Sequence, residues 1–424
     1  MNREEVISFI DNSKKFGSKL ELERIKKLCE LLGNPQDRLK FIHIAGTNGK
    51  GSTSLYIHNI LVDAGYKTGL YTSPFIYEFN ERIQINGTPI SDDKLAEIMS
   101  IVAAKVKIMT EEGYEHPTEF ELITAAAFLY FETEKCNAVV LEVGLGGTYD
   151  ATNVIKTSIL SVITSISLDH TDYLGDTVSE VAENKCGIIK EGVPVLSYMY
   201  QPVDALNIIK MSAEKNHSHL TVAAEESLEI NRMSLGGSDF KYQGECYHTS
   251  LIGKYQIYNA ITAISAVGLL NDAGFAVSLE NVKNGLSQAK WPARFEILST
   301  NPTVIADGSH NADGMRAFVD TAKAVLSDKP ICVFGMLKDK DYDYCLKKLS
   351  EITETVIVTE VDNPRRETAE NLAKTAKKYI KSVYLEKENQ NAVKKAQELA
   401  GDDGTVIALG SLYMMKNIKD AIKK

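Results

Sequence analysis

The chain has 424 residues, of which 44% are hydrophobic and 25% charged, so its composition is that of a globular protein with two or three domains. Acidic residues outnumber Lys and Arg by 57 to 47, which argues against binding nucleic acid through its phosphates. No apolar run approaches the roughly 18 residues of a membrane span, and residues 1–5 lack the apolar core of a signal peptide. We therefore expect a cytoplasmic protein without membrane or nucleic-acid partners. The six cysteines are scattered, and we expect reduced thiols.

Short apolar, β-branched runs alternate with helix-like stretches along the chain. In the first part, the predicted strands are residues 41–45, 138–143 and 158–166, and the predicted helices are residues 52–64 and 120–131. After Trp291-Pro292, the predicted strands are residues 303–306, 331–334, 355–358 and 405–409, with a helix over 369–378. Strands separated by helices predict an α/β protein with parallel sheets. We place a boundary at residue 292, which gives domains of residues 1–292 and 293–424.

A glycine-rich turn joins the first predicted strand to the helix that follows it. Its residues are Gly46, Thr47, Asn48, Gly49, Lys50, Gly51 and Ser52. Glycines let backbone N–H groups approach a phosphate, the helix N-terminus adds its dipole, Lys50 adds a charge, and a hydroxyl can reach Mg²⁺. The spacing differs from the common G-x-x-x-x-G-K-[ST] loop, because a glycine separates Lys50 from Ser52. The pattern favours a nucleotide phosphate site over a plain glycine turn with a surface lysine.

Polar residues also follow other predicted strands. Glu142 ends one strand next to a run of glycines, and Asp169-His170 follow another. Because the carboxyl ends of parallel strands meet at one edge and Mg²⁺ prefers oxygen ligands, Glu142 and His170 are candidate metal ligands. Taken alone, Glu142 also fits a solvated acid and His170 a structural histidine. Ser73 ends a further strand, where turn chemistry is sufficient to explain it.

Two further segments are ambiguous when only their residues are considered. Lys185 lies late in a helical stretch, where a solvated lysine is the ordinary interpretation. Residues 307–311 read Asp-Gly-Ser-His-Asn and follow a strand of the second predicted domain. They fit a strand-end site that faces a crevice between two α/β domains, and they fit a tight turn into the next helix equally well.

The order of these motifs resembles that of the folylpolyglutamate synthase and dihydrofolate synthase family, within the Mur ligase superfamily. The shared segments are residues 32–36, 42–52, 72–74, 80–83, 118–121, 141–147, 150–154, 168–170, 185–188, 256–260, 291–294 and 307–311. They cover nearly the whole chain. The resemblance implies an N-terminal P-loop ATPase domain with a parallel sheet, and a smaller C-terminal Rossmann-like α/β domain that acts as the glutamate ligase domain.

The resemblance also implies roles for individual residues. The expected catalytic residues are Lys50, His310 and Lys185, the last carboxylated to a carbamate. The expected ATP contacts are residues 46–52, Asn259, Arg294 and Asp307. The expected ligands of two Mg²⁺ ions are Ser52, Ser73, Glu142, His170 and Lys185. The folate pocket is expected at Phe75, Thr118, Glu119, Phe120 and Glu121.

The implied reaction is ATP-dependent amide formation from a reduced folate and L-glutamate, through an acyl phosphate, in a monomer. The chain departs from many members at Phe75 (often His), Thr148 (often Arg) and Ala312 (often Pro). Because losing a guanidinium removes a bidentate donor, we expect folylpolyglutamate synthesis as the main activity. A bifunctional enzyme that also makes dihydrofolate remains an alternative. A cell-wall Mur-type ligase and a non-catalytic nucleotide-binding protein are more distant alternatives.

Overall fold

The computed structural model describes residues 1–13, 21–225 and 227–422. Strands and helices alternate along the chain, and most neighbouring strands are parallel, so the predicted α/β fold is confirmed. The chain forms two compact units. The first consists of Met1–Glu226 and Tyr258–Ala289, and the second of Ser227–Ile257 and Lys290–Lys424.

The first unit is built on an eight-stranded sheet with the order β4-β3-β2-β5-β1-β6-β7-β8. In that order the strands are Thr88–Pro89, Ile83–Ile85, Thr68–Tyr71, Ala138–Glu142, Phe41–Ala45, Ser158–Ile163, Val195–Ser197 and Leu220–Val222. The six neighbouring strands β2, β5, β1, β6, β7 and β8 are parallel, whereas β3 and β4 form an antiparallel edge beside β2. β6 ends at Ile163, earlier than predicted, because the next residues turn to hydrogen-bond the loop after β1.

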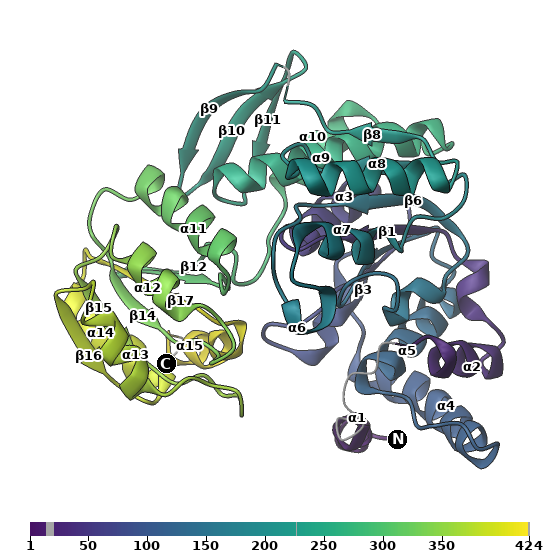
Figure 1. Ribbon diagram of the computed structural model, residues 1–424, viewed down its shortest axis with the longest axis horizontal. Helices are drawn as coiled ribbons and strands as arrows, with labels where there is room; N and C mark the ends of the chain where they lie inside the picture. The colour runs from purple at the N-terminus through teal and green to yellow at the C-terminus, as the bar shows by residue number, and fades with distance from the viewer. Residues whose placement is uncertain (14–20, 226, 423–424) are drawn as a thin grey trace. The chain divides into compact units, whose positions relative to one another are not determined.

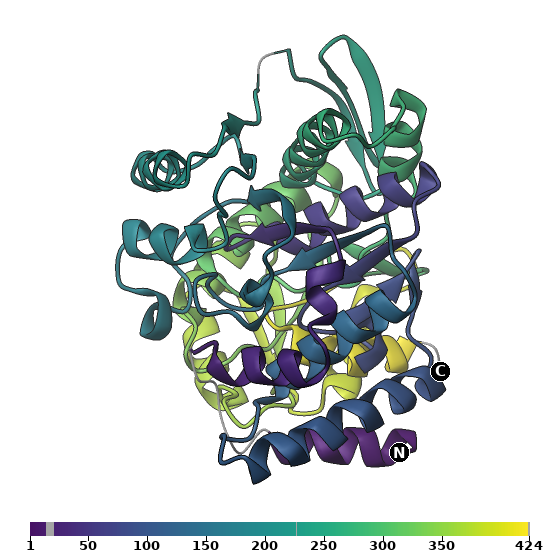
Figure 2. The same ribbon diagram turned by 90° about the vertical axis from the view of Figure 1, so that its right-hand side faces the viewer.

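Helices lie against this sheet (Figure 1), and its apolar side chains are buried. Phe41, Tyr71, Val139 and Leu141 pack in one core with α1, α2, α4 and α5, and α1 and α4 lie side by side in Figures 1 and 2. α3 packs on β1, β2 and β5, and α10 packs on α3. The helices are α1 (Arg3–Ser13), α2 (Glu23–Leu31), α3 (Lys50–Asp63), α4 (Asp92–Glu111), α5 (Glu119–Thr133), α6 (Thr171–Leu174), α7 (Val178–Cys186), α8 (Val203–Lys215), α9 (Lys254–Asp272) and α10 (Leu279–Ser287), with short 3₁₀ helices η2 (Pro35–Arg38), η3 (Phe79–Arg82) and η4 (Ala151–Val154).

The second unit contains a six-stranded sheet with the order β12-β13-β17-β14-β15-β16. In that order the strands are Glu296–Thr300, Thr303–Asp307, Thr405–Leu409, Ile331–Phe334, Thr355–Val358 and Ser382–Leu385. All pairs are parallel except β12 with β13, and the four strands predicted after residue 292 are all present. The helices are α11 (Ala312–Val325), α12 (Tyr342–Leu349), α13 (Ala369–Ala376), α14 (Asn389–Ala400) and α15 (Met415–Ile422), with the 3₁₀ helix η5 (Leu412–Met414).

A small antiparallel sheet was not predicted from the sequence. It consists of β9 (Glu229–Ser234), β10 (Gly237–Tyr242) and β11 (Glu245–Thr249), drawn in teal in Figure 1. The predicted division at residue 292 assigns residues 227–257 to the first domain, whereas their contacts place them in the second compact unit. The strands are short and largely polar, and sequence position alone does not show which core they join. Among the described residues, no helix has the length and apolar character needed to span a membrane.

α3 is buried along most of its length and contains a histidine in the core. Residues 52–58 are all buried, and Nε2 of His58 accepts a hydrogen bond of 3.0 Å from the backbone N–H of Gly87. Because charged imidazole loses its hydration in this position, burial lowers the pKa of His58 to about 4. Between that value and the unfolded pKa of about 6.5, the unfolded chain binds more protons, so stability falls as the pH falls through this window.

We predict that His58→Gln makes the protein less sensitive to acid. The glutamine oxygen still accepts from Gly87 N–H but does not titrate. Between pH 7 and pH 4.5, the free energy of unfolding should fall by about 2–3 kcal/mol less in the variant than in the wild type. Urea unfolding at the two pH values measures this difference, with His219→Gln on the exposed surface as the control. An identical loss of stability in wild type and His58→Gln would contradict the prediction.

Candidate functional site

The predicted phosphate loop, residues 46–52, connects the carboxyl end of β1 to the first turn of α3. Gly49 precedes the helix with a φ of +88°, a left-handed conformation that glycine adopts without steric cost. Nζ of Lys50 donates to the carbonyl oxygens of Gly46 at 3.1 Å and Thr47 at 3.2 Å. The lysine therefore folds back over its own loop, and its charge lies beside the backbone that would bind a phosphate.

The loop after β6 holds the phosphate loop in place. The backbone N–H of Thr47 donates to the carbonyl of Ser165 at 2.7 Å. The Thr47 hydroxyl donates to the carbonyl of Ser167 at 2.9 Å and accepts from the Ser167 N–H at 3.1 Å. A Cβ on Gly46 would collide with the Thr164 side chain, so the two loops approach to backbone distance. Because the hydrogen bonds hold the two loops this close together, only glycine fits at position 46.

Asn259, on α9, borders the other side of the phosphate loop. A Cβ placed on Gly49 would lie 2.5 Å from the Asn259 Oδ1 atom, closer than real atoms pack. Asn259 is buried, as expected of a side chain packed against backbone. The structure thus brings one predicted nucleotide contact, Asn259, against the predicted phosphate loop.

Lys185 lies at the end of α7, and only 4% of its surface is exposed. Its Nζ donates to the Gly46 carbonyl oxygen at 2.8 Å, the same acceptor that Lys50 uses. Burial and, to a smaller extent, the charge of Lys50 lower the pKa of Lys185 to about 7, against the opposing charges of Asp169 and Asp150. The interpretation of Lys185 as an ordinary solvated lysine is therefore wrong. It is a buried amine held at the phosphate loop.

Glu142 and Ser73 lie next to each other at the same edge of the sheet. Glu142 is the last residue of β5, and its Oε2 accepts from the Ser73 backbone N–H at 3.3 Å. Glu142 is buried, so the alternative of a solvated acid does not apply. The Glu142 carboxylate is thus hydrogen-bonded to the Ser73 backbone where strands β2 and β5 end, and the side chains of both residues carry oxygen atoms of the kind that Mg²⁺ binds.

A network of buried polar side chains supports the glycine loop that follows Glu142. Asp150 accepts from Leu145 N–H at 2.8 Å and from the Thr152 hydroxyl at 2.5 Å, and that hydroxyl lies 2.9 Å from Nε2 of His43. Burial lowers the pKa of His43 to about 3, so its ring is neutral. Because the Thr152 proton is used on Asp150, His43 donates through Nε2. The sequence predicted no role for this network, because its link to His43 joins positions more than a hundred residues apart.

His170 takes a different position from the other predicted metal ligands. It precedes α6 with a φ of +52°, is exposed, and its backbone N–H donates to the Asp169 carboxylate at 2.9 Å. Ser52 is buried in the first turn of α3. Across the described residues, no three His, Cys, Asp or Glu side chains gather closely enough to hold a metal by themselves. The predicted magnesium set depends instead on hydroxyl oxygens and on Lys185.

The predicted folate residues at the start of α5 have structural partners. Thr118 and Glu121 form a reciprocal cap, in which Thr118 N–H donates to Glu121 at 2.7 Å and Glu121 N–H donates to the Thr118 hydroxyl at 3.3 Å. Buried Glu121 also accepts from Arg24 Nε at 3.1 Å. The Phe120 ring packs against Tyr71, with centroids 6.0 Å apart. The segment is thus firmly fixed beside β2.

Phe75 covers a buried arginine. The Arg82 guanidinium lies 5.2 Å from the Phe75 ring centroid and 5.8 Å from that of Phe79, and its nearest carboxylate atom, on Glu119, is 3.8 Å away. Arg82 is 9% exposed and Phe75 is 38% exposed. Sequence analysis quoted Arg82 within a family motif but assigned it no role.

In the second unit, Asp307, Arg294 and His310 form a cluster of their own. Asp307 ends β13, and its carboxylate accepts from Phe295 N–H and Ser309 N–H, both at 2.8 Å. Burial raises the pKa of Asp307, while neighbouring Arg294 opposes the rise. Nδ1 of His310 lies 2.8 Å from the Gly308 carbonyl oxygen. The predicted tight turn is present, and it fixes the strand-end residues through Asp307.

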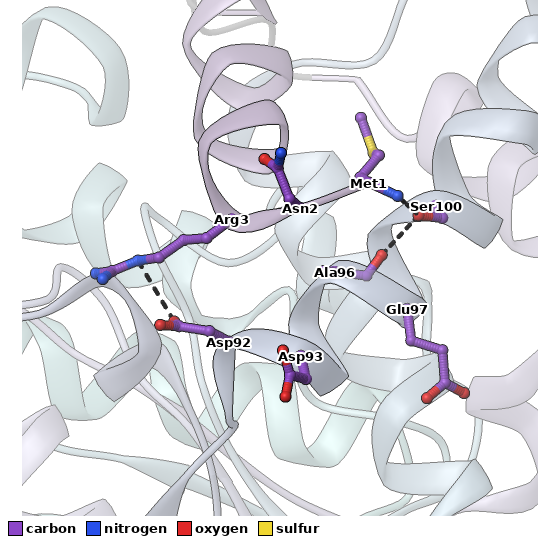
Figure 3. Close-up of a pocket in the computed structure, with 8 residues that line it drawn as sticks. All are labelled: Met1, Asn2, Arg3, Asp92, Asp93, Ala96, Glu97 and Ser100. Atoms are coloured by element: carbon purple, nitrogen blue, oxygen red, sulfur yellow. Dashed lines mark hydrogen bonds and ion pairs between the residues drawn. The ribbon is translucent and has the colours of Figure 1, made fainter.

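A surface pocket of about 420 Å³ lies apart from these residues. It is lined by Met1, Asn2, Arg3, Asp92, Asp93, Ala96, Glu97 and Ser100, from the beginnings of α1 and α4 (Figure 3). Arg3 pairs with Asp92 at 3.4 Å, and the Met1 amine donates to the Ser100 hydroxyl at 2.7 Å. None of the predicted site residues lines it, so its size does not identify it as the functional site.

Comparison with known proteins identifies the family. The model "Mur ligase middle domain" matches residues 44–267, and "Mur ligase, glutamate ligase domain" matches residues 293–412. The chain is 38% identical to the dihydrofolate synthase/folylpolyglutamate synthase of Bacillus subtilis (strain 168), over 98% of each chain. It is 33% identical to the folylpolyglutamate synthase of Lacticaseibacillus casei, over 100% of this chain and 99% of that one.

A solved structure has the same fold over its full length. Folylpolyglutamate synthase from Mycobacterium tuberculosis, complexed with ADP and AMPPCP, superimposes with a TM-score of 0.90 at 27% identity, covering 100% of this chain and 99% of that one. The family models, the relatives and this shared fold agree with the motifs and with the phosphate loop described above. The chain belongs to the folylpolyglutamate synthase and dihydrofolate synthase family of Mur-type ligases.

Proposed function

We propose that this chain is an ATP-dependent ligase that adds L-glutamate to the glutamate tail of reduced folates. The observation that carries the proposal is the convergence of Lys50 and Lys185 on the phosphate loop, in a chain that matches folylpolyglutamate synthases over its whole length. In this reaction a folate carboxylate takes the γ-phosphoryl group of ATP, and the amine of L-glutamate then displaces phosphate. Phosphoryl transfer depends mainly on positioning and charge neutralisation.

The phosphate loop provides the ATP site in this proposal. Its backbone N–H groups and the N-terminal dipole of α3 bind the phosphates, and Lys50 neutralises charge on them. The absent Cβ atoms at Gly46 and Gly49 leave a cradle of backbone that a nucleotide can approach closely. Asn259, which packs on Gly49, contacts the nucleotide from α9.

The residues around Glu142 fit magnesium. The Glu142 carboxylate and Ser73 lie side by side, and Ser52 and His170 complete the proposed ligands, with oxygen atoms in the majority. Bound Mg²⁺ supplies positive charge to the transferring phosphoryl group. The protein holds these ligands at the strand ends, in part because the Asp150 carboxylate accepts from Leu145 N–H and so fixes the loop after Glu142.

Lys185 fits this site as a carbamate. An ammonium beside Lys50 and a metal would be repelled, whereas a carbamate is an anionic oxygen ligand. Forming it requires a neutral amine, and burial beside Lys50 favours the neutral form. The family resemblance further supports Arg294 and Asp307 as proposed nucleotide contacts and His310 as a proposed catalytic residue near the reacting phosphate.

The folate site in this proposal lies at Phe75 and at the start of α5. Thr118, Glu119, Phe120 and Glu121 form one fixed wall, since their backbone is capped and Glu121 is tied to Arg24. Phe75, in the loop after β2, adds exposed aromatic surface. A rigid wall beside a side chain that can move suits a flat ring with a flexible tail.

A second activity, dihydrofolate synthesis, is favoured by one observation: the relative with 38% identity is named for both activities. The residue at position 148 argues for folylpolyglutamate synthesis instead. Many members have arginine there, whereas the backbone N–H and the hydroxyl of Thr148 both donate to the Asn184 carbonyl at 2.9 Å. Thr148 therefore holds the glycine loop to α7 and offers no guanidinium to a substrate.

ADP release against a panel of acceptors tests the proposed function. With L-glutamate present, we expect a tetrahydrofolate monoglutamate to support turnover with a higher kcat/KM than dihydropteroate. Comparable kcat/KM values for the two acceptors would establish a bifunctional enzyme instead. No amide from either acceptor would contradict the proposal.

We predict that Lys185→Ala and Lys185→Met fold normally but lose activity by a factor on the order of 10²–10³, because each removes transition-state charge stabilisation. Small carboxylates such as acetate should partly restore Lys185→Ala. Steady-state ADP release measures the loss, and circular dichroism checks the fold. Lys156→Ala, at an exposed position, is the control and should retain wild-type turnover. Full activity in either Lys185 variant would remove the carbamate from the mechanism.

A pair of glycine variants tests the phosphate loop. Gly49 and Gly65 have nearly equal φ values of +88° and +85°, but nothing lies within 4 Å of a Cβ at Gly65. Alanine at either position should cost about 1–2 kcal/mol of stability through its left-handed conformation. Gly49→Ala should also weaken AMPPCP binding at least ~10-fold through the contact with Asn259, since misplaced loop amides lose charge-assisted hydrogen bonds. Isothermal titration calorimetry measures the Kd of AMPPCP for each variant. Equal Kd values for Gly49→Ala and Gly65→Ala would refute the assignment of residues 46–52 as the phosphate loop.

A further inference from the structure

Two buried arginines in the first unit differ in how their charge is satisfied. Arg24 donates to Glu121 at 3.1 Å, to Glu21 at 3.3 Å and to Glu115 at 3.4 Å. Arg82 is also buried, at 9% exposed against 3% for Arg24, yet no described residue accepts a hydrogen bond from its guanidinium, and its Nε is fully buried without an acceptor. Glu119, at 3.8 Å, lies beyond hydrogen-bond distance. A buried charge with unused donors is unstable unless another anion completes it.

The surroundings of Arg82 indicate what kind of anion fits. Phe75 and Phe79 flank the guanidinium, and their rings pack edge to face with centroids 5.8 Å apart. These apolar walls suit an organic carboxylate better than a strongly hydrated phosphate. Glu119 already offsets part of the arginine charge, which leaves room for one further negative charge rather than several. A guanidinium presents the planar fork that binds a carboxylate through two parallel hydrogen bonds.

Arg82 is placed close to the reacting end of the site. The Arg82 carbonyl accepts a hydrogen bond from the Thr72 N–H at 3.0 Å. Ser73, which follows Thr72, donates its backbone N–H to the proposed magnesium ligand Glu142. Phe75 packs on the guanidinium and is itself 38% exposed, so one of the two rings that flank Arg82 reaches solvent. Exposed side chains change rotamer within nanoseconds, so this ring can move aside when a ligand arrives.

We propose that Arg82 binds the α-carboxylate of the terminal glutamate on the folate acceptor, and that this contact selects glutamylated folates over dihydropteroate. The inference rests on the proposed function and specifies its acceptor. A glutamylated folate carries two terminal carboxylates, one that reacts and one that does not. Dihydropteroate carries a single carboxylate, which must react. Arg82 is thus a specificity-determining residue, and its unused donors are satisfied when the correct acceptor is bound.

A pair of acceptors that differ by one carboxylate tests the proposal. Tetrahydropteroylglutamate and tetrahydropteroyl-γ-aminobutyrate present the same reacting carboxylate, but the second lacks the α-carboxylate. With wild type, we expect kcat/KM to be about 10- to 100-fold higher for the glutamate acceptor, which is the range for a hydrogen bond to a charged group. In Arg82→Gln that advantage should disappear through a higher KM for the glutamate acceptor. Turnover of the aminobutyrate acceptor and the KM for L-glutamate should stay unchanged.

Further variants separate recognition from folding. Arg82→Lys, which keeps the charge but loses the planar pair of donors, should restore part of the preference, and Arg38→Gln, at an exposed position in η2, should behave as wild type. Calorimetric Kd values in the presence of AMPPCP give the same comparison without turnover. Equal use of the two acceptors by wild type would overturn the proposal. An equal loss for both acceptors in Arg82→Gln and Arg82→Lys, or a raised KM for L-glutamate alone, would also overturn it. No amide from either acceptor with wild type would instead refute the proposed function itself.

Discussion

Two lysine side chains share one acceptor in this protein, and the site is organised around that contact. Lys50 and Lys185 both donate to the Gly46 carbonyl oxygen, at 3.1 and 2.8 Å. Two full positive charges so close together, one of them buried, repel each other in a medium of low dielectric. The repulsion is relieved when Lys185 becomes neutral, which is the direction in which its pKa is shifted. The fold thus places a buried amine with a lowered pKa at the proposed nucleotide site, where we propose that it is carboxylated.

The geometry of that contact depends on loops rather than on the lysines themselves. Gly46 is held because the loop after β6 bonds Thr47 through backbone and hydroxyl groups. The loop after β5 is held by Asp150, whose carboxylate accepts from Leu145 N–H. The Thr47 contacts join the end of β1 to the end of its neighbour β6, whereas the Asp150 contact closes the loop after β5 on itself. The strand order of the sheet therefore decides which side chains meet, and these contacts fix their positions.

Much of the fold follows from local sequence pattern, and part of the site does not. β1, β14, β15 and β17 were predicted at their observed bounds, because buried parallel strands are short runs of β-branched residues between glycine or polar turns. The small β9–β11 sheet was missed, since short polar strands do not show which core they join. The glycine-rich turn at residues 46–52 was predicted between a strand and a helix, and it connects β1 to α3 in the structure, because such turn chemistry is local.

The roles of Lys185, Asp150 and Arg82 have a different origin. Burial lowers the pKa of Lys185, which the sequence alone presents as an ordinary helix lysine, and burial is a property of the folded chain. Asp150 reaches His43 through Thr152, a link between positions more than a hundred residues apart. Arg82 becomes informative through the absence of a hydrogen-bond acceptor among the described residues, which no sequence pattern expresses. The family resemblance supplied Lys185, whereas Arg82 emerged from the structure.

The central claim is that the chain activates a folate carboxylate by phosphorylation before L-glutamate attacks. Isotope transfer tests this most directly. A tetrahydrofolate monoglutamate labelled with ¹⁸O in its reacting carboxylate is incubated with the enzyme, ATP, Mg²⁺ and L-glutamate, and the released phosphate is analysed by mass spectrometry. The account predicts one ¹⁸O atom in each phosphate, with one amide formed for each ADP. Release of ADP with unlabelled phosphate would show that the carboxylate is never phosphorylated and would contradict the account.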